Sequence, residues 1–72
     1  MKDSAGNFIR VGQTVKHICT DVVYRVEFLN KLTFEKYHIY GDKTEGIYLI
    51  NNSNRGWKLT PERANRVRVI GE

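Results

Sequence analysis

The sequence predicts an all-β domain, a small barrel of five or six strands with one short 3-10 turn before the last strand. Short runs of β-branched and aromatic residues recur along the chain, and each ends at a cluster of Gly, Asn or Asp. No segment keeps the helical spacing of apolar residues over three turns. The chain has 72 residues and one cysteine, which predicts a single domain without an internal disulfide. Closure of the sheet would remove edges that favour aggregation.

The first half of the chain predicts a loose start followed by two long β segments. Residues 1–7 are polar and predict a flexible N-terminus, so the barrel domain is expected to cover residues 8–70. The first clear strand is 14–19, and a strand with good alternation follows at 22–29. Residues 32–40 are rich in aromatic and β-branched types and predict another long β segment. The residues expected on the core face of the 22–29 strand are Val22, Tyr24, Val26 and Phe28.

The second half predicts a hairpin, one helical turn and a closing strand. The turn cluster 51–56 separates the apolar run 47–50 from a short strand around Trp57, because Asn tolerates a positive φ and Gly has no Cβ to clash. Thr60 can cap a helical turn that has Pro61 at its first position. Only about one turn fits before residues 66–69, so we expect a short 3-10 or α turn rather than a full helix. Alternation there turns Val67 toward the core and Arg68 toward water.

Composition bounds the functions that remain. The net charge is +4, and residues 51–72 hold five of the twelve basic side chains but only two of the eight acidic ones. Four of those five are arginines, which bind phosphate or carboxylate with two hydrogen bonds. The alternative is that these basic side chains bind no ligand and only keep the small protein soluble. The N-terminus has no apolar run like that of a signal peptide, and no segment is long enough to span a bilayer. We therefore expect a cytoplasmic protein that does not contact membranes.

Metal binding and catalysis are weakly indicated. His17, Cys19 and His38 are the soft-ligand candidates, but they lack the compact spacing of a zinc site. A nucleophile such as Cys19 would need an oxyanion hole and a cleft, and a chain of this size leaves little room for either. We therefore expect no catalytic residues, no metal, no cofactor and no small-molecule substrate.

Three segments resemble SH3-like barrels of the KOW and Tudor-like kind. They are the opening 11–15, Val-Gly-Gln-Thr-Val; the hairpin 47–57; and the helical turn with its closing strand, 60–69. The resemblance covers most of residues 11–70, although Gln13 stands where KOW modules more often have an acidic residue. It implies the barrel fold and leaves the ligand open. Small solitary barrels of this layout also resemble accessory proteins of bacteriophages or prophages.

These patterns predict a non-enzymatic binding module whose ligand is nucleic acid, DNA or RNA. The alternative is a protein-interaction module, a small regulator or inhibitor that binds an acidic protein surface; a homo-oligomer with a structural role is a third possibility. Tyr48 is predicted to be exposed beside the basic segment, whereas the pattern does not decide whether Trp57 lies in the core or on the surface. The predicted binding residues are Tyr48, Arg55, Trp57, Lys58, Arg63, Arg66 and Arg68.

Overall fold

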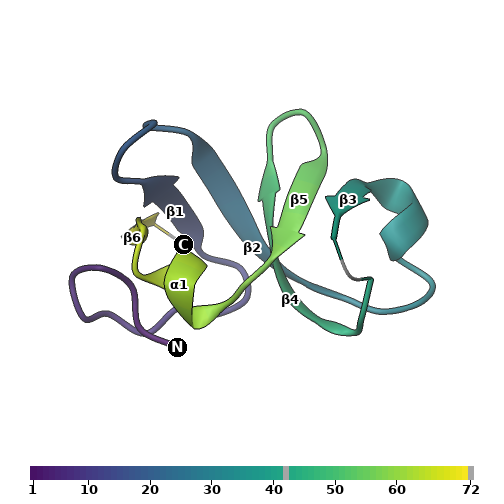
Figure 1. Cartoon of the computed structure of the whole chain (residues 1–72), viewed down its shortest axis with the longest axis horizontal. Helices are drawn as coiled ribbons and strands as arrows, with labels where there is room; N and C mark the ends of the chain where they lie inside the picture. The colour runs from purple at the N-terminus through teal and green to yellow at the C-terminus, as the bar shows by residue number, and fades with distance from the viewer. Residues whose placement is uncertain (42, 72) are drawn as a thin grey trace.

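A computed structural model describes residues 1–41 and 43–71 of the chain. In this part of the chain, six strands form one sheet, with one 3-10 turn and one single-turn α-helix (Figure 1). The prediction of a mostly β domain is therefore confirmed. In chain order the elements are β1 (Thr14–His17), β2 (Val23–Leu29), η1 (Phe34–Lys36), β3 (His38–Tyr40), β4 (Gly46–Asn51), β5 (Arg55–Lys58), α1 (Pro61–Ala64) and β6 (Val67–Gly71).

The strands lie in the order β3-β5-β4-β2-β1-β6, and every neighbouring pair is antiparallel except β3 with β5. β3 and β6 are the edge strands, and among the described residues they do not pair with each other, so the sheet is open. Figure 1 shows β1, β6 and α1 at one end of an elongated molecule and β3 with η1 at the other. Closure into a barrel therefore stays a prediction.

The sheet carries a hydrophobic cluster on each face, because its central strand β4 is buried on both sides. Leu49 and its partner Val26 on β2 point to one face of the sheet, where the first cluster lies. Ile50, the next residue along β4, points to the opposite face, where the second cluster lies. The buried members of the first cluster are Ile9, Val15, Val26, Leu49, Leu59, Ala64 and Val67. Those of the second cluster are Leu29, Phe34, Ile39, Tyr48 and Ile50.

Tyr48 belongs to the second cluster, so the prediction that it is exposed is wrong. Its side chain is 0% exposed, and the ring of Phe34 meets it edge-on with the centroids 5.6 Å apart. Its hydroxyl donates to the carbonyl oxygen of Thr44 at 2.6 Å and accepts from the N–H of Thr44 at 3.1 Å. The prediction took one face of β4 to be exposed to solvent. Residues 34–39 instead pack on that face and bury it.

Replacing Tyr48 with phenylalanine is expected to lower the free energy of unfolding by about 1 kcal/mol, because the backbone of Thr44 loses its hydroxyl partner. The ring and its packing stay. Urea denaturation followed by circular dichroism measures the change. The matched control is Tyr40→Phe at a more exposed tyrosine, 38% exposed, which should shift stability by less than about 0.5 kcal/mol. Equal losses in the two variants would contradict this role of the Tyr48 hydroxyl.

The segment 32–40 differs most from its prediction as one long β segment, and the difference begins at Asn30. The Thr33 hydroxyl accepts the N–H of Asn30 at 2.8 Å, and the Asn30 side chain accepts the N–H of Leu32 at 2.9 Å. Such local bonds compete with strand pairing and favour a turn. They lead into the 3-10 turn η1, which buries Phe34 and leaves only β3 extended.

The single turn expected before the last strand is present as α1, in the α-helical rather than the 3-10 form. The N–H of Ala64 donates to the carbonyl of Thr60 at 2.8 Å, the four-residue spacing of an α-helix. The predicted cap is present, since the Thr60 hydroxyl accepts the N–H of Arg63 at 3.3 Å. Pro61 occupies the first helical position as predicted.

Two of the residues predicted on the core face of the 22–29 strand are exposed. Val22 is 38% exposed and Phe28 is 50% exposed, whereas Val26 between them is fully buried. The first cluster therefore covers only the middle of this segment. Beyond it, Leu29 points to the opposite face and joins the second cluster.

Gly56 lies inside β5 rather than in the predicted turn. The residue of that turn with a positive φ is Asn54, at 58°. Gly56 is instead placed where β5 passes between two side chains of the second cluster, Ile39 on β3 and Ile50 on β4. A hydrogen in place of a side chain allows the three strands to pack at this point.

The N-terminal segment, predicted to be flexible, contacts the last strand through Asp3, which is only 4% exposed. One carboxylate oxygen of Asp3 accepts the N–H groups of Ala5 and Asn7, at 2.9 and 2.7 Å. The other accepts the N–H of Val69 at 2.8 Å. The N–H of Ser4 also donates to the carbonyl of Val67 at 2.9 Å. Residues 3 and 4 thus cover part of the outer edge of β6.

Candidate functional site

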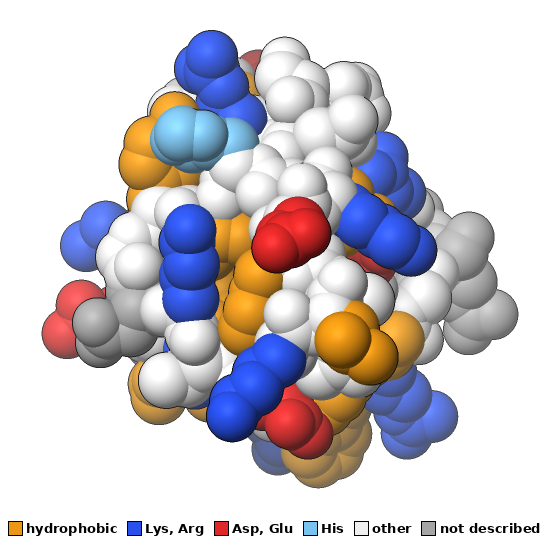
Figure 2. Space-filling view, turned by 90° about the vertical axis from the view of Figure 1, so that its right-hand side faces the viewer, with side chains coloured by type: hydrophobic (Ala, Val, Ile, Leu, Met, Phe, Trp, Pro, Cys, Tyr) orange, Lys and Arg blue, Asp and Glu red, His pale blue; other side chains and the backbone are white. Residues whose placement is uncertain are grey.

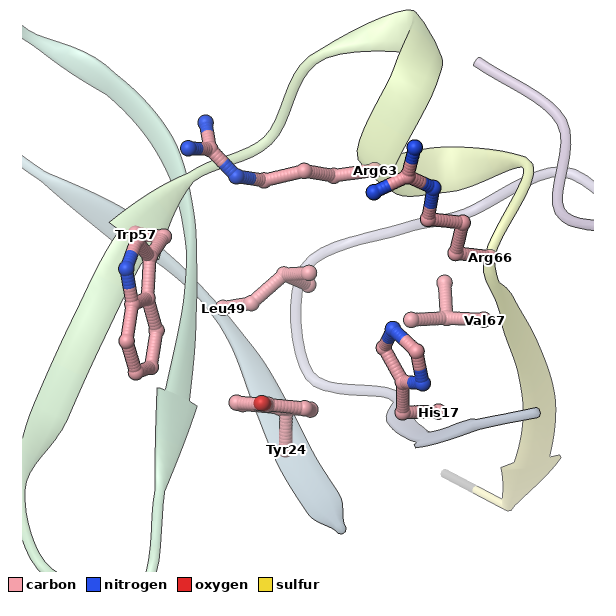
Figure 3. Close-up of a pocket in the computed structure, with 7 residues that line it drawn as sticks. All are labelled: His17, Tyr24, Leu49, Trp57, Arg63, Arg66 and Val67. Carbon is pink, nitrogen blue, oxygen red and sulfur yellow. The ribbon is translucent and has the colours of Figure 1, made fainter. Parts of the chain in front are cut away.

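A cleft of about 190 Å³ opens between β5 on one side and β1 with β6 on the other. In Figure 3, Trp57 forms one wall, His17 and Val67 form the other, and two arginine side chains lie along one rim. Its volume is below the roughly 300–1,000 Å³ of pockets that enclose drug-sized ligands, so it suits one flat group. The residues that line this cleft are His17, Tyr24, Leu49, Trp57, Arg63, Arg66 and Val67.

Trp57 enters the cleft because of its register in the sheet. It is paired with Leu49, which faces the first cluster, so the half-buried indole lies at the border of that cluster. Trp57 stacks on Tyr40 with ring centroids 5.0 Å apart and 19° between the planes. It meets Tyr24 at 6.0 Å and 86°. His38 contacts Tyr40 at 4.6 Å, so these four rings form a continuous aromatic row.

The two arginines at the rim are positioned by the backbone around α1. The guanidinium of Arg63 donates from Nη1 to the carbonyl of Lys58 at 3.0 Å, which ties it to the end of β5. The N–H of Arg66 donates to the carbonyl of Arg63 at 3.1 Å, and the carbonyl of Arg66 accepts the N–H of Ile18 at 2.9 Å. Arg63 is therefore held by a side-chain hydrogen bond to β5, and Arg66 by its backbone hydrogen bonds. Both side chains remain exposed at the cleft.

Neither rim arginine is neutralised by a carboxylate of the described residues. The ion pairs in that part of the chain are Lys16 with Asp21 at 3.7 Å and Arg25 with Glu27 at 3.4 Å. Arg63 and Arg66 therefore present two positive charges beside an aromatic wall. This arrangement favours a ligand that combines a flat ring with negative charge.

His17 is oriented by the turn that follows β1. Its Nδ1 accepts the N–H of Cys19 at 3.1 Å and that of Thr20 at 3.3 Å. The neutral ring therefore carries its hydrogen on Nε2, which is left as a donor at the cleft. No group of three or more His, Cys, Asp or Glu that could hold a metal lies within residues 1–41 and 43–71. Cys19 itself is exposed and free.

The structure divides the predicted binding residues among several places. Trp57, Arg63 and Arg66 meet at the cleft. Arg55 is exposed, two residues before Trp57 on β5 and opposite His38 of β3. Lys58 lies on the other face, where it is paired with Tyr48 and donates from Nζ to the hydroxyl of Thr44. Arg68 lies beside Lys16 on the outer side of β6 and β1, and Tyr48 is buried in the second cluster.

Sequence reasoning misses three contributors to this site. Tyr24 is predicted in the core, and it packs against the first cluster, but only from the rim. Tyr40 reaches Trp57 through the parallel pairing of β3 with β5, which no local pattern predicts. For His17, the pattern raises only metal binding or catalysis. The feature that could have indicated a binding role for His17 is its position at the end of β1, the strand that pairs with the arginine-rich strand β6.

The end of the molecule opposite α1 has a different character. Figure 2 shows that end, with single Lys and Arg side chains separated by acidic and hydrophobic ones. Positive charge forms no continuous stripe over the described residues in that view. The cleft, where two arginines and a histidine meet aromatic rings, is the more specific feature.

Comparisons with protein-family models, with curated proteins and with solved structures find no match to this chain. Among the described residues, no helix has the length and apolar character needed to cross a membrane.

Proposed function

We propose that this chain is a non-enzymatic module that binds nucleic acid in the cleft between Trp57 and Arg66. The observation that carries the proposal is the pair of rim arginines without carboxylate partners among the described residues, beside a row of aromatic rings. Stacking of a base on an aromatic side chain contributes roughly 1–3 kcal/mol and tolerates any sequence. Arginine supplies the phosphate contacts that dominate affinity.

The fold supports the SH3-like class as part of the same proposal. Five antiparallel strands follow the order β5-β4-β2-β1-β6, and the single helical turn α1 connects the two outer strands of this set. The described residues that line the cleft include no carboxylate and no thiol. That composition offers no activated nucleophile beside the histidine, which favours binding over nucleophilic chemistry. The free thiol of Cys19 suits a reducing cytoplasm.

Reversing the charge of Arg66 is expected to weaken binding of a single- or double-stranded oligonucleotide at least tenfold at about 50 mM salt. The reason is that an acidic side chain at the rim repels phosphate. Trp57 is the only tryptophan of the chain, so quenching of its fluorescence reports occupancy of the cleft directly. The matched control is Arg10→Glu, an equal charge change at an exposed arginine that does not line the cleft. It should weaken binding much less than Arg66→Glu.

Two results would overturn the proposal. One is an affinity of the unmodified protein no tighter than about 10⁻⁴ M for DNA and RNA at low salt, the weak limit of ordinary non-specific binding. The other is a pull-down that recovers one stoichiometric partner whether or not nuclease is added. That second result would support the alternative, an acidic protein surface bound by the same arginines.

A further inference from the structure

A second hollow lies next to the cleft, on the outer side of β1 and β6. It is lined by Lys16, His17, Ile18, Asp21 and Arg68. His17 is among the residues that line both hollows, so the two adjoin at the end of β1. The molecule therefore offers two neighbouring recesses with one shared residue between them.

The charges of the second hollow continue those of the cleft. Lys16 and Arg68 are directly opposite each other in the β1–β6 pair. The acidic group there is Asp21, 3.7 Å from the Lys16 ammonium, and both side chains are solvent-exposed. An exposed pair of this length contributes little and can be exchanged for another anion. Arg68 takes part in no ion pair of the described residues.

We propose that the chain binds single-stranded nucleic acid along one path that connects the two hollows. This inference rests on the proposed function and adds the form of the ligand and its direction across the surface. A base lies in the cleft against Trp57, and the backbone crosses the rim at His17. The following phosphates are bound by Arg68 and Lys16.

The dimensions of the cleft favour a single strand over a duplex. Its volume of about 190 Å³ admits one ring system, and its aromatic wall can be reached only by a base that is not paired and stacked within a helix. Arg66 and Arg68 are two residues apart, so their Cα atoms are about 6–7 Å apart along an extended chain. One lines the cleft and the other the second hollow, which extends the binding surface along the strand.

His17 links the two parts of the path. Its Nδ1 is held by the backbone N–H groups of Cys19 and Thr20, which fixes the ring. Its Nε2 has no partner among the described residues, so it can donate to an oxygen of the crossing backbone. The histidine is thus a positioning contact between the base site and the outer phosphate site.

The test compares labelled thymidine strands of 2 and about 12 nucleotides by fluorescence anisotropy, together with oligouridylate and a DNA duplex of the longer length. The single phosphate of the dinucleotide crosses the rim and leaves Arg68 and Lys16 without a phosphate partner. The unmodified protein should bind the longer strand at least tenfold more tightly than the shorter one, and more tightly than the duplex. The double variant Lys16→Ala/Arg68→Ala should lose most of that gain while binding the short strand as before. Its salt dependence on the longer strand should fall in slope by about 0.7 for each phosphate that it no longer binds. The uridylate arm shows whether RNA follows the same path.

A control variant, Lys31→Ala, removes an exposed cation that lines neither hollow and should leave the gain with length unchanged. Duplex binding equal to or tighter than that of the single strand would overturn the inference. A gain with length that survives in the double variant would do the same, and in both cases nucleic-acid binding in the cleft would stand. Failure to bind any of the four probes would instead remove the proposed function itself. Thermal denaturation of each variant verifies that it remains folded.

Discussion

Replacing Gly56 with alanine is expected to lower the free energy of unfolding by about 3 kcal/mol, the largest loss that we expect from a single methyl group in this chain. A Cβ at this position would lie 2.3 Å from Cδ1 of Ile50, 2.9 Å from the carbonyl oxygen of Leu49 and 3.2 Å from Cδ1 of Ile39. A side-chain methyl can rotate away, but the carbonyl is part of the β4 backbone and cannot. The strands must therefore separate, and the second cluster loses its packing.

The matched control is Gly71→Ala, also at a strand residue. A Cβ at Gly71 meets no atom within 4 Å, and the backbone there has no positive φ. That variant should change stability by less than about 0.5 kcal/mol. Urea denaturation of both variants measures the difference. If Gly56→Ala were as stable as Gly71→Ala, the close passage of β5 between β3 and β4 would be wrong.

Replacing Asp3 with asparagine is expected to lower the free energy of unfolding by about 2 kcal/mol at neutral pH. The amide oxygen of asparagine can still accept the N–H groups of Ala5 and Asn7. Its amide nitrogen then faces the N–H of Val69, so a charge-assisted hydrogen bond is exchanged for two opposed donors. The loss therefore falls on the link between the N-terminal segment and β6.

This loss should depend on pH with a defined sign. Burial alone would raise the pKa of Asp3, but the N–H donors of Val69, Asn7 and Ala5 stabilise the ionised form and hold its pKa below the ordinary value. The unfolded chain has the ordinary pKa of about 4. The stabilisation is therefore complete above that pH and is lost as the pH falls through the lower native pKa. The stabilities of the unmodified protein and Asp3→Asn should begin to approach each other as the pH falls below about 4, and should meet once the pH is below the native pKa of Asp3.

Asp21→Asn is the control for this experiment. Asp21 is an exposed aspartate with a weak ion pair, so its substitution should change stability by less than about 0.5 kcal/mol at any of these pH values. Denaturation curves recorded between pH 2 and pH 7 measure all three proteins. A constant difference between Asp3→Asn and the unmodified protein down to pH 2 would contradict the role given to the ionised carboxylate.

Local chemistry makes part of the fold predictable. The Thr60 cap and Pro61 mark a helical turn because they satisfy or remove N–H groups within a few residues. Alternation in the last strand correctly turns Val67 inward and Arg68 outward. Such signals act over short distances along the chain, so they are visible without knowledge of the partner strands.

The second cluster and the cleft are not predictable by the same means. Burial of Tyr48 depends on residues 34–39 covering the other face of β4, and their turn arises from Asn30 and Thr33 rather than from an apolar period. The aromatic wall likewise requires Tyr40, which reaches Trp57 through a parallel pairing. Three of the predicted binding residues meet at the cleft, whereas the others lie elsewhere because strand pairing, not sequence distance, sets their positions.

The hydrogen bond between Asp3 and Val69 joins residues 66 positions apart. Bringing such distant residues together carries the entropic cost of closing a long loop. This cost becomes small only once β1 and β6 have paired and already hold β6 in place. We therefore expect this bond to form after the folding barrier has been crossed. In that case its loss would speed unfolding far more than it slows folding, and Asp3 would set the lifetime of the folded domain.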